Sequence, residues 1–215
     1  LSDEKGTVLP GVYAAGEAAC VSVHGANRLG TNSLLDIVVF GKRAGQSMVD
    51  YVTQTKPNTI SDSASDDLSK KIQNLIDKEH TDEFSVANIR KDLQESMEEN
   101  AKIFRTKETL EKQTEILEEL RERYENVTIF DKSKVHNSEL VEAIELDYLL
   151  DMSEATVASA LARNESRGAH SRQDFPERDD QNFMKHSFAF KKDNSANLKY
   201  KDVELGKYEP MERKY

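Results

Sequence analysis

The 215-residue chain has a net charge of -10 at neutral pH, and 33% of its residues are charged. A mean hydropathy of -0.72 is typical of a soluble protein, and no apolar run approaches the ~18 residues needed to cross a bilayer. The negative charge argues against nucleic acid or anionic lipid as a general partner. A single cysteine excludes an internal disulfide framework, a self-contained iron–sulfur site and a cysteine-rich zinc site.

The stretch from residue 9 to 45 differs from the charged, helical sequence that follows it, and reads LPGVYAAGEAACVSVHGANRLGTNSLLDIVVFGKRAG. Val12 to Ala15 is a β-prone run closed by Gly16, which predicts a short strand. Glu17 would stand at the end of this strand, where a carboxylate can accept hydrogen bonds from sugar-like hydroxyl groups.

A loop without strong periodicity follows from residue 18 to 31. Gly25 and Gly30 free its backbone to pass close to a bound molecule. Arg28 is the only lysine or arginine on the loop, and its planar guanidinium matches a carboxylate in bidentate fashion. The loop therefore predicts an anion site. Cys20 is expected to be a small buried hydrophobe rather than a reactive thiol.

A buried helix is predicted after the loop, with Asn32 or Ser33 as its N-cap and with small and apolar residues at helical spacing, Ile37, Gly41, Ala44 and Met48. Its N-terminus offers free N–H groups and a partial positive charge. An anionic or electron-rich ligand edge is expected against Ser33 and Leu34. Asp36, one turn into the helix, is expected to favour the helix dipole rather than to perform acid–base chemistry.

Four further helices are predicted after a polar linker that contains residues 56–58 and 61–67. They cover about Asp67 to Lys78, about Val86 to Phe104, a segment capped by Thr106, and Glu139 to about Ala162. Leu110, Leu117 and Tyr124 repeat every seven residues in the third, which indicates the seam of a small bundle. The charges around Glu118 to Arg123 are interpreted as a solvated face.

The last of these helices is predicted to begin at Asn137 or Ser138 and is apolar on more than one face, so we expect it to be covered on both sides. Glu165 to Asp180, ESRGAHSRQDFPERDD, sets arginines among carboxylates, as in an ion-paired docking surface or a set of structural salt bridges. Beyond Phe183, MKHSFAFKK and NLKYKDVEL alternate as two strands do, and Gly206 and Pro210 end this sheet.

GVYAAGEAACVSVHGANRLGTNSLLDIVVFG closely resembles the second flavin-binding segment of the succinate dehydrogenase flavoprotein subunit. The fumarate reductase flavoprotein and L-aspartate oxidase share the HGANRL core, which fixes only the superfamily; the flanking residues look most like succinate dehydrogenase. The Glu165 to Asp180 segment also resembles this family, which suggests a position near the flavin domain and an iron–sulfur partner. The likeness continues to the terminal KYEPMERKY and is weakest between Tyr51 and Ala87.

This resemblance implies FAD as the cofactor. Glu17 would bind the ribose or ribityl part of FAD, and the backbone N–H groups of Ser33 and Leu34 would hold the isoalloxazine, with Asn32 in the same cofactor-binding set. No metal site is expected.

The resemblance also implies a dicarboxylate substrate, with Arg28 clamping one carboxyl group and the backbone of Thr31 beside it. Thr31 departs from the family, which more often has Ala, Gly or Ser there, but a backbone contact survives a change of side chain. For His24 two interpretations stay open, a substrate or flavin neighbour and a loop residue that fixes its own fold through a backbone hydrogen bond.

The implied function is that of the succinate dehydrogenase flavoprotein subunit, which oxidises succinate to fumarate by hydride transfer to FAD. Electrons would pass to an iron–sulfur subunit and quinone, and membrane anchor subunits would hold the assembly peripherally on the inner membrane, at the cytoplasmic face in bacteria or the matrix face in mitochondria. Fumarate reductase and L-aspartate oxidase are the alternative enzymes. The non-enzymatic alternative is a helical interaction module with a relict flavin motif, against which the intact Glu17, Arg28, Asn32 and Ser33 argue.

The predicted fold class is the α/β end of a flavin-binding domain at residues 1–54, a mainly α helical bundle at 55–163, and a small α+β domain with a short antiparallel sheet at 164–215. The sequence has no G-x-G-x-x-G after a strand. We therefore expect it to be the C-terminal part of a larger flavoprotein and to be inactive alone. The resemblance places the flavin-linking histidine and the catalytic base in upstream sequence.

Overall fold

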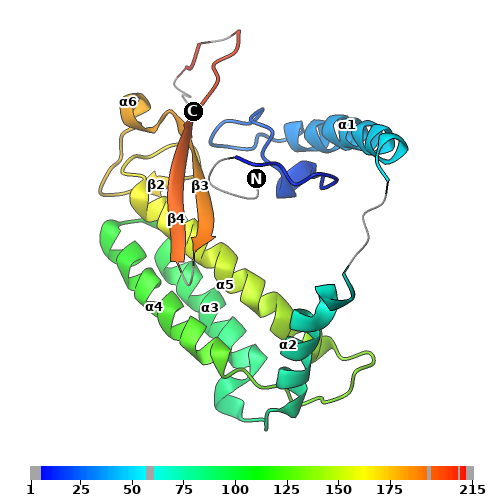
Figure 1. Ribbon diagram of the computed structural model, residues 1–215. Coiled ribbons are helices and arrows are strands. Elements are labelled where there is room, and N and C mark those ends of the chain that lie inside the picture. Colours follow the sequence, from blue (N-terminus) through cyan, green and yellow to red (C-terminus); the bar gives the residue numbers. More distant parts are fainter. Residues whose placement is uncertain (1–5, 57–60, 193–194, 208, 212–215) are drawn as a thin grey trace.

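A computed structural model describes residues 6–56, 61–192, 195–207 and 209–211. Figure 1 shows a bundle of helices, a β-hairpin lying along it, and an N-terminal loop and helix beside the hairpin. The longer elements are α1 (Asn32–Gln54), α2 (Asp66–Asp77), α3 (Val86–Ala101), α4 (Lys107–Glu125), α5 (Ser138–Ala162), β3 (Lys185–Lys192) and β4 (Ser195–Asp202). The short ones are η1 (Gly16–Ala18), η2 (Asp62–Ser65), η3 (Asp82–Phe84), β1 (Phe104–Arg105), β2 (Ser171–Arg172) and α6 (Asp180–Phe183).

The predicted bundle helices are confirmed, and side-chain caps fix where three of them begin. Thr106 caps α4 in a reciprocal pair with Thr109, since each backbone N–H donates to the other residue's Oγ1 at 3.1 and 3.2 Å. Asn137, rather than Ser138, caps α5, with its Oδ1 accepting from the Leu140 N–H at 2.8 Å. Ser85 caps α3 in the same way.

α3 ends at Ala101, earlier than predicted, because the chain enters a second pairing. Phe104 and Arg105 form the short strand β1, which pairs in parallel with β2, in the register Phe104 to Ser171 and Arg105 to Arg172. This contact joins the bundle to the segment that follows α5. The sequence did not indicate it, since a two-residue strand has no periodicity to detect.

The core lies between α3, α4 and α5. The seven-residue repeat in α4 is buried as predicted, with Leu110, Leu117 and Tyr124 exposed by 0%, 2% and 8%. They meet buried side chains of the neighbouring helices, chiefly Ile89, Leu93, Leu146 and Leu150. Each buried leucine or isoleucine contributes about 1.5–3 kcal/mol. The Tyr124 hydroxyl donates to the Ala143 carbonyl at 2.9 Å, so its polar end is satisfied within the core.

Only part of the expectation for α5 holds. One face packs into the bundle, and the β3–β4 hairpin lies against the helix (Figure 1). A second apolar set stays exposed in the described chain, namely Val141, Tyr148, Leu149 and Met152. The hairpin itself is confirmed as antiparallel, pairing Lys185 with Asp202 at one end and Lys192 with Ser195 at the other.

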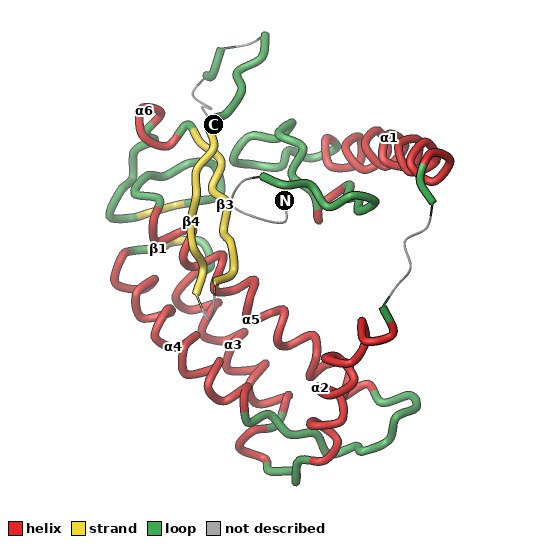
Figure 2. The backbone as a smooth tube through the Cα atoms, in the orientation of Figure 1, coloured by secondary structure: helices red, strands yellow, loops and turns green. Residues whose placement is uncertain are grey.

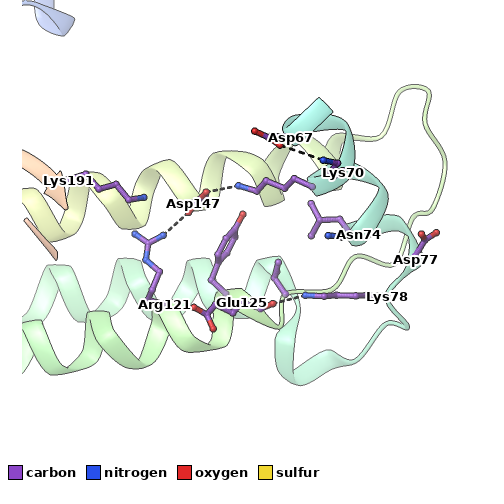
Figure 3. A pocket seen from close by; sticks show the side chains of 13 residues that line it. Asp67, Lys70, Asn74, Asp77, Lys78, Arg121, Glu125, Asp147 and Lys191 are labelled. Atoms are coloured by element: carbon purple, nitrogen blue, oxygen red, sulfur yellow. Dashed lines mark hydrogen bonds and ion pairs between the residues drawn. The ribbon is translucent and has the colours of Figure 1, made fainter. Parts of the chain in front are cut away.

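Arg121, predicted on a solvated face, is buried and ties several elements together. Its guanidinium reaches Asp147 at 2.6 Å, Asp151 at 2.6 Å and Glu154 at 2.9 Å on α5. Lys71 of α2 joins Asp147 at 2.5 Å, so α2, α4 and α5 share one ionic network. Arg121 and Asp147 also line a cavity of about 790 Å³ beside α2 (Figure 3).

The N-terminal region differs from its prediction in two ways. Val12 to Ala15 pairs with no strand in the described residues, and the chain before α1 is loop apart from the η1 turn (Figure 2). α1 forms as predicted but is not buried, since Asp36 is the one buried residue of its 23. Both differences have one cause: strands and apolar helix faces need partners from elsewhere in a chain, and the described residues supply none here.

The exposed face of α1 predicts association of the 215-residue chain. Leu34, Ile37 and Val38 are helical neighbours and are each at least 49% exposed, which leaves an apolar patch near the start of α1. We expect helical circular dichroism together with oligomers or aggregates in light scattering. Trimming the chain to about Ser65 should give a monomer that keeps the signal of the bundle helices.

A pair of variants localises this effect to the apolar face. Val38→Asp should reduce association, whereas Gln46→Asp, an equal charge change at an exposed polar position of α1, should leave it unchanged. A monomeric parent chain would contradict the prediction.

Candidate functional site

A cavity of about 610 Å³ lies between the loop before α1 and the C-terminal part of the chain. The loop brings three of the predicted ligand-binding residues to it, Glu17, His24 and Arg28. The opposite wall consists of side chains from the segments around β2 and β3, chiefly Arg163, Arg167, His170, Lys185 and His186. Glu17 is the one carboxylate among all these lining residues, so the cavity suits an anionic ligand.

Arg28 and His24 meet at one oxygen atom of Asp36. Arg28 Nη2 donates to Asp36 Oδ2 at 2.7 Å, and His24 Nε2 donates to the same Oδ2 at 3.1 Å. The His24 and Arg28 donors hold the pKa of the Asp36 carboxyl below its usual value, against the opposing effect of burial. Asp36 thus stays ionised beneath the two residues that face the cavity.

Two buried atoms of this cluster have no hydrogen-bond partner in the described chain, Arg28 Nε and Asp36 Oδ1. A buried donor without an acceptor is costly and rare in a folded protein. Arg28 Nε is therefore a donor that a bound carboxylate could satisfy, and it belongs to a residue that lines the cavity.

Glu17 sits on the η1 turn with its side chain exposed, and its carboxylate has no hydrogen bond within the described residues. Gly16 makes this position possible because its φ of +79° is in the left-handed region. A Cβ there would also lie 3.1 Å from Ile37 Cγ1, so the glycine lets the turn pack closely on α1. Glu17 is thereby held at the cavity edge as a free acceptor.

The start of α1 lies outside the cavity lining. Thr31, not Asn32 or Ser33, is the N-cap, and it has a φ of +70° that is strained for a β-branched residue. The Leu34 N–H donates to the Thr31 carbonyl at 3.1 Å. The N–H groups of Asn32 and Ser33 have no acceptor within the described chain, so they are the free donors of this helix end.

Cys20 was predicted to be buried, and this was wrong: it is exposed and lines the cavity. Its neighbours on the loop pack against no core, so an apolar side chain in this position has nothing to cover it.

The opposite wall is built on Glu165, whose side chain is fully buried. Its carboxylate accepts from Arg163 at 2.6 Å, from Arg167 at 2.9 Å through both oxygens, and from the Asp179 N–H at 2.9 Å. Burial alone would raise the pKa of Glu165, but these donors lower it overall. The ion pairs predicted for this segment are therefore present.

Arg172, also buried, closes the end of α5. Its Nη1 donates to the carbonyls of Ala160, Leu161 and Arg163 at 3.1 to 3.3 Å, and its other side makes a bidentate pair with Asp174 at 2.8 Å. The Arg172 guanidinium holds the pKa of Asp174 well below its usual range. Arg172 thus fixes this segment to the C-terminal end of α5.

The two motif-bearing segments touch at Gly168. Its φ is +59°, and a Cβ there would lie 2.8 Å from Ala26 Cβ and 2.7 Å from Asn27 Oδ1. Nearby, Ser22 Oγ and His186 Nε2 are within hydrogen-bonding distance at 3.1 Å. The loop that carries His24 and Arg28 therefore rests directly on the wall built around Glu165.

Comparisons with known proteins identify the family of the chain. A family model described as the fumarate reductase flavoprotein C-terminus matches residues 90–215, and an FAD-binding domain model matches residues 2–34. The chain belongs to the succinate dehydrogenase and fumarate reductase flavoprotein family. Its members are FAD-dependent oxidoreductases, and FAD is the cofactor that this membership assigns.

Some of the relatives are named succinate dehydrogenase flavoprotein subunits and others fumarate reductase flavoprotein subunits. The succinate dehydrogenase flavoprotein subunit of Rickettsia bellii is 45% identical over 185 residues, covering 85% of this chain and 30% of the relative. The fumarate reductase flavoprotein subunit of a Serratia species is 42% identical over 214 residues, covering 97% and 36%. The chain thus spans about a third of the length of such relatives.

Solved structures show the same fold. An E. coli quinol fumarate reductase chain aligns with a TM-score of 0.87 at 36% identity, covering 94% of this chain and 35% of its own length. The Sdh1 complex of Mycobacterium smegmatis aligns with a TM-score of 0.77 at 32% identity, covering 87% and 32%. Within the described ranges, none of the helices has the length and apolar character of a membrane span, and no three potential metal ligands cluster.

Sequence reasoning underestimated Asp36 and assigned no role to His170. Asp36 follows Arg28 by eight residues, and its position in the otherwise apolar run from Leu34 to Phe40 was the available signal. His170 Nδ1 accepts a hydrogen bond from Arg105 Nη1 at 3.0 Å, and its Nε2 donates to the Arg163 carbonyl at 3.1 Å. Arg105 and His170 are brought together by the unpredicted β1–β2 pairing. Burial lowers the pKa of His170, and the positive charges of the neighbouring arginines lower it further.

Glu165→Gln should destabilise the wall at neutral pH. The change leaves Arg163 and Arg167 without their buried counter-charge, which costs about 3–5 kcal/mol for buried pairs. Because the folded pKa of Glu165 is lowered from 4.5, its contribution is present above that value and is lost as pH falls through the folded pKa. In thermal unfolding, the Tm should therefore fall less between pH 7 and pH 3 in the variant than in the parent. The exposed Glu177→Gln is the matched control and should behave as the parent.

Gly168→Ala should loosen the loop against the wall. The new methyl group would meet the Ala26 backbone carbon at 2.9 Å, and the positive φ adds strain of about 1 kcal/mol or more. Hydrogen exchange of amides from residue 22 to 28 should become faster. Gly41→Ala, which meets no atom within 4 Å, should leave that exchange unchanged, and equal protection in both variants would contradict the predicted contact.

Proposed function

We propose that the chain is the C-terminal part of a flavoprotein subunit that oxidises succinate to fumarate with FAD. The observation that supports this most is the cavity in which Glu17, His24 and Arg28 meet, where Arg28 keeps a buried N–H without an acceptor. We propose the division into a flavin-domain segment at residues 1–54, a helical domain at 55–163 and a C-terminal domain at 164–215.

The donors and acceptors of the chain fit parts of FAD. Glu17 is a free, exposed carboxylate, which suits the hydroxyl groups of the ribose or ribityl chain. Asn32 and Ser33 present N–H groups that no acceptor of the described residues pairs with, at the positive end of α1, and these suit the electron-rich edge of the isoalloxazine. We assign Leu34 to the same set, although its N–H already donates to Thr31.

Arg28 is the proposed clamp for one carboxylate of the dicarboxylate substrate, with the Thr31 backbone and His24 as neighbours. A guanidinium offers five donors in a fixed plane, and Asp36 takes only one of them. Bound FAD supplies the redox chemistry by accepting a hydride. The chain's own residues orient the substrate and stabilise negative charge near the start of α1.

Further parts of the proposal lie beyond these residues. We expect the catalytic base and a flavin-linking histidine in upstream sequence, and inactivity of the 215 residues alone. The proposed partners are an iron–sulfur subunit and, through it, quinone and membrane anchor subunits, with the protein peripheral on the inner membrane. The name of one structural relative, the Sdh1 complex, supports an assembly of this kind.

Fumarate reduction is the second candidate. It is supported by relatives such as the fumarate reductase flavoprotein subunit of a Serratia species, which is 42% identical over 97% of this chain. The same clamp would hold either dicarboxylate, so the direction must be measured in both senses with succinate and fumarate. Oxidation of L-aspartate instead would assign the protein to the L-aspartate oxidases, and no turnover in a flavin-loaded full-length protein would favour the interaction module.

Arg28→Lys in the full-length flavoprotein tests the proposal. A lysine ammonium is a point charge and cannot match a carboxylate with two parallel hydrogen bonds. We expect FAD content and fold to be retained while most succinate oxidation is lost. Arg43→Lys on the exposed side of α1 is the control and should keep the parental kcat/KM. Near-normal kcat/KM in Arg28→Lys would remove Arg28 from the substrate site.

A further inference from the structure

We propose that Asp36 is a positioning residue that sets the orientation of Arg28, and with it His24, toward the bound dicarboxylate. The inference rests on the proposed function and adds to it a residue that does not touch the ligand cavity itself. Asp36 is absent from the cavity lining, whereas both of its partners are in it.

The geometry favours control of orientation. Arg28 and His24 belong to an irregular loop, while Asp36 is fixed on the 23-residue helix α1 and is only 4% exposed. Both side chains converge on the same Oδ2 atom, at 2.7 and 3.1 Å. An irregular loop is thereby fastened to a regular helix at the two residues that face the cavity.

An ionised carboxylate only accepts hydrogen bonds, so the bond to Asp36 requires a hydrogen on His24 Nε2. The second ring nitrogen, Nδ1, makes no bond to Asp36. For Arg28 the bond occupies one Nη2 hydrogen. Nε keeps its hydrogen without an acceptor, buried in the described chain. Asp36 therefore fixes the guanidinium plane while leaving donors for a ligand.

A role in stability alone does not account for the arrangement. Asp36 Oδ1 is buried with no donor in the described residues, while Oδ2 accepts twice. An unpaired buried acceptor costs free energy, so hydrogen-bond satisfaction within the described residues does not explain why both donors share Oδ2. The crowding of both donors on one oxygen instead places Arg28 and His24 side by side at the cavity.

The test uses the full-length, FAD-loaded flavoprotein with Asp36→Asn, which keeps the side-chain shape and removes the charge. Malonate, a dicarboxylate that cannot be oxidised to an alkene, reports binding by calorimetry without turnover. We expect its Kd to rise about tenfold or more, as for a lost charged hydrogen bond. The KM for succinate should rise more than kcat falls, with FAD content close to that of the parent and Tm lowered, because Arg28 loses its buried counter-charge. Asp50→Asn, exposed on the same helix, should change none of these.

The decisive measurement is coupling to Arg28. If Asp36 acts through Arg28, then Asp36→Asn should add less than about twofold to the malonate Kd in an Arg28→Ala background. Full additivity would overturn the inference, as would an unchanged Kd in the single variant. If Arg28→Ala alone leaves the Kd unchanged, the proposed function fails; if it weakens binding but Asp36→Asn does not, only the positioning role fails.

Asp36→Glu keeps the test valid if the asparagine variant does not fold. It retains the counter-charge for Arg28 but moves the carboxylate by one methylene, so it should fold and still bind malonate more weakly than the parent. Parental affinity and KM in this variant would overturn the inference, because a correctly positioned oxygen would then be unnecessary.

Discussion

A fully buried carboxylate needs several donors at once, and Glu165 places this requirement at the centre of the structure. Arg163, Arg167 and the Asp179 N–H all converge on it, which shapes the segment after α5 into a fixed wall. Gly168 projects from this wall against Ala26 with no room for a side chain. The position of the cavity loop thus depends on an ionic cluster whose central carboxylate, Glu165, lies outside the cavity lining.

Local chemistry made much of the fold predictable from the sequence. The caps at Thr106 and Asn137, the seven-residue repeat of α4 and the alternation of the hairpin each depend on residues close together in the chain, and all were confirmed. For the site, the motif around Arg28 identified the loop, and the structure brings Glu17, His24 and Arg28 to one cavity. The proposed binding roles stay predictions.

What could not be predicted depends on partners distant in the sequence. Arg121 looked like part of a solvated face, yet carboxylates about 30 residues away bury it. The opposite error occurs where an expected partner is not among the described residues. This applies to the missing strand at Val12, the exposed Cys20 and the uncovered face of α1. Periodicity tells which face of an element is apolar but not what covers it.

The two buried carboxylates also explain how an acidic chain presents a cationic cavity. With a net charge of -10, the surface as a whole repels anions. Glu165 and Asp36 lie behind the arginines that they pair with, outside the cavity lining, so the guanidinium groups stand between these negative charges and the cavity. Each carboxylate offsets the cost of burying its arginine while leaving the cationic side toward the ligand. The cavity lining is therefore richer in cationic than in acidic side chains although the chain as a whole is acidic, which favours an anionic ligand at this place.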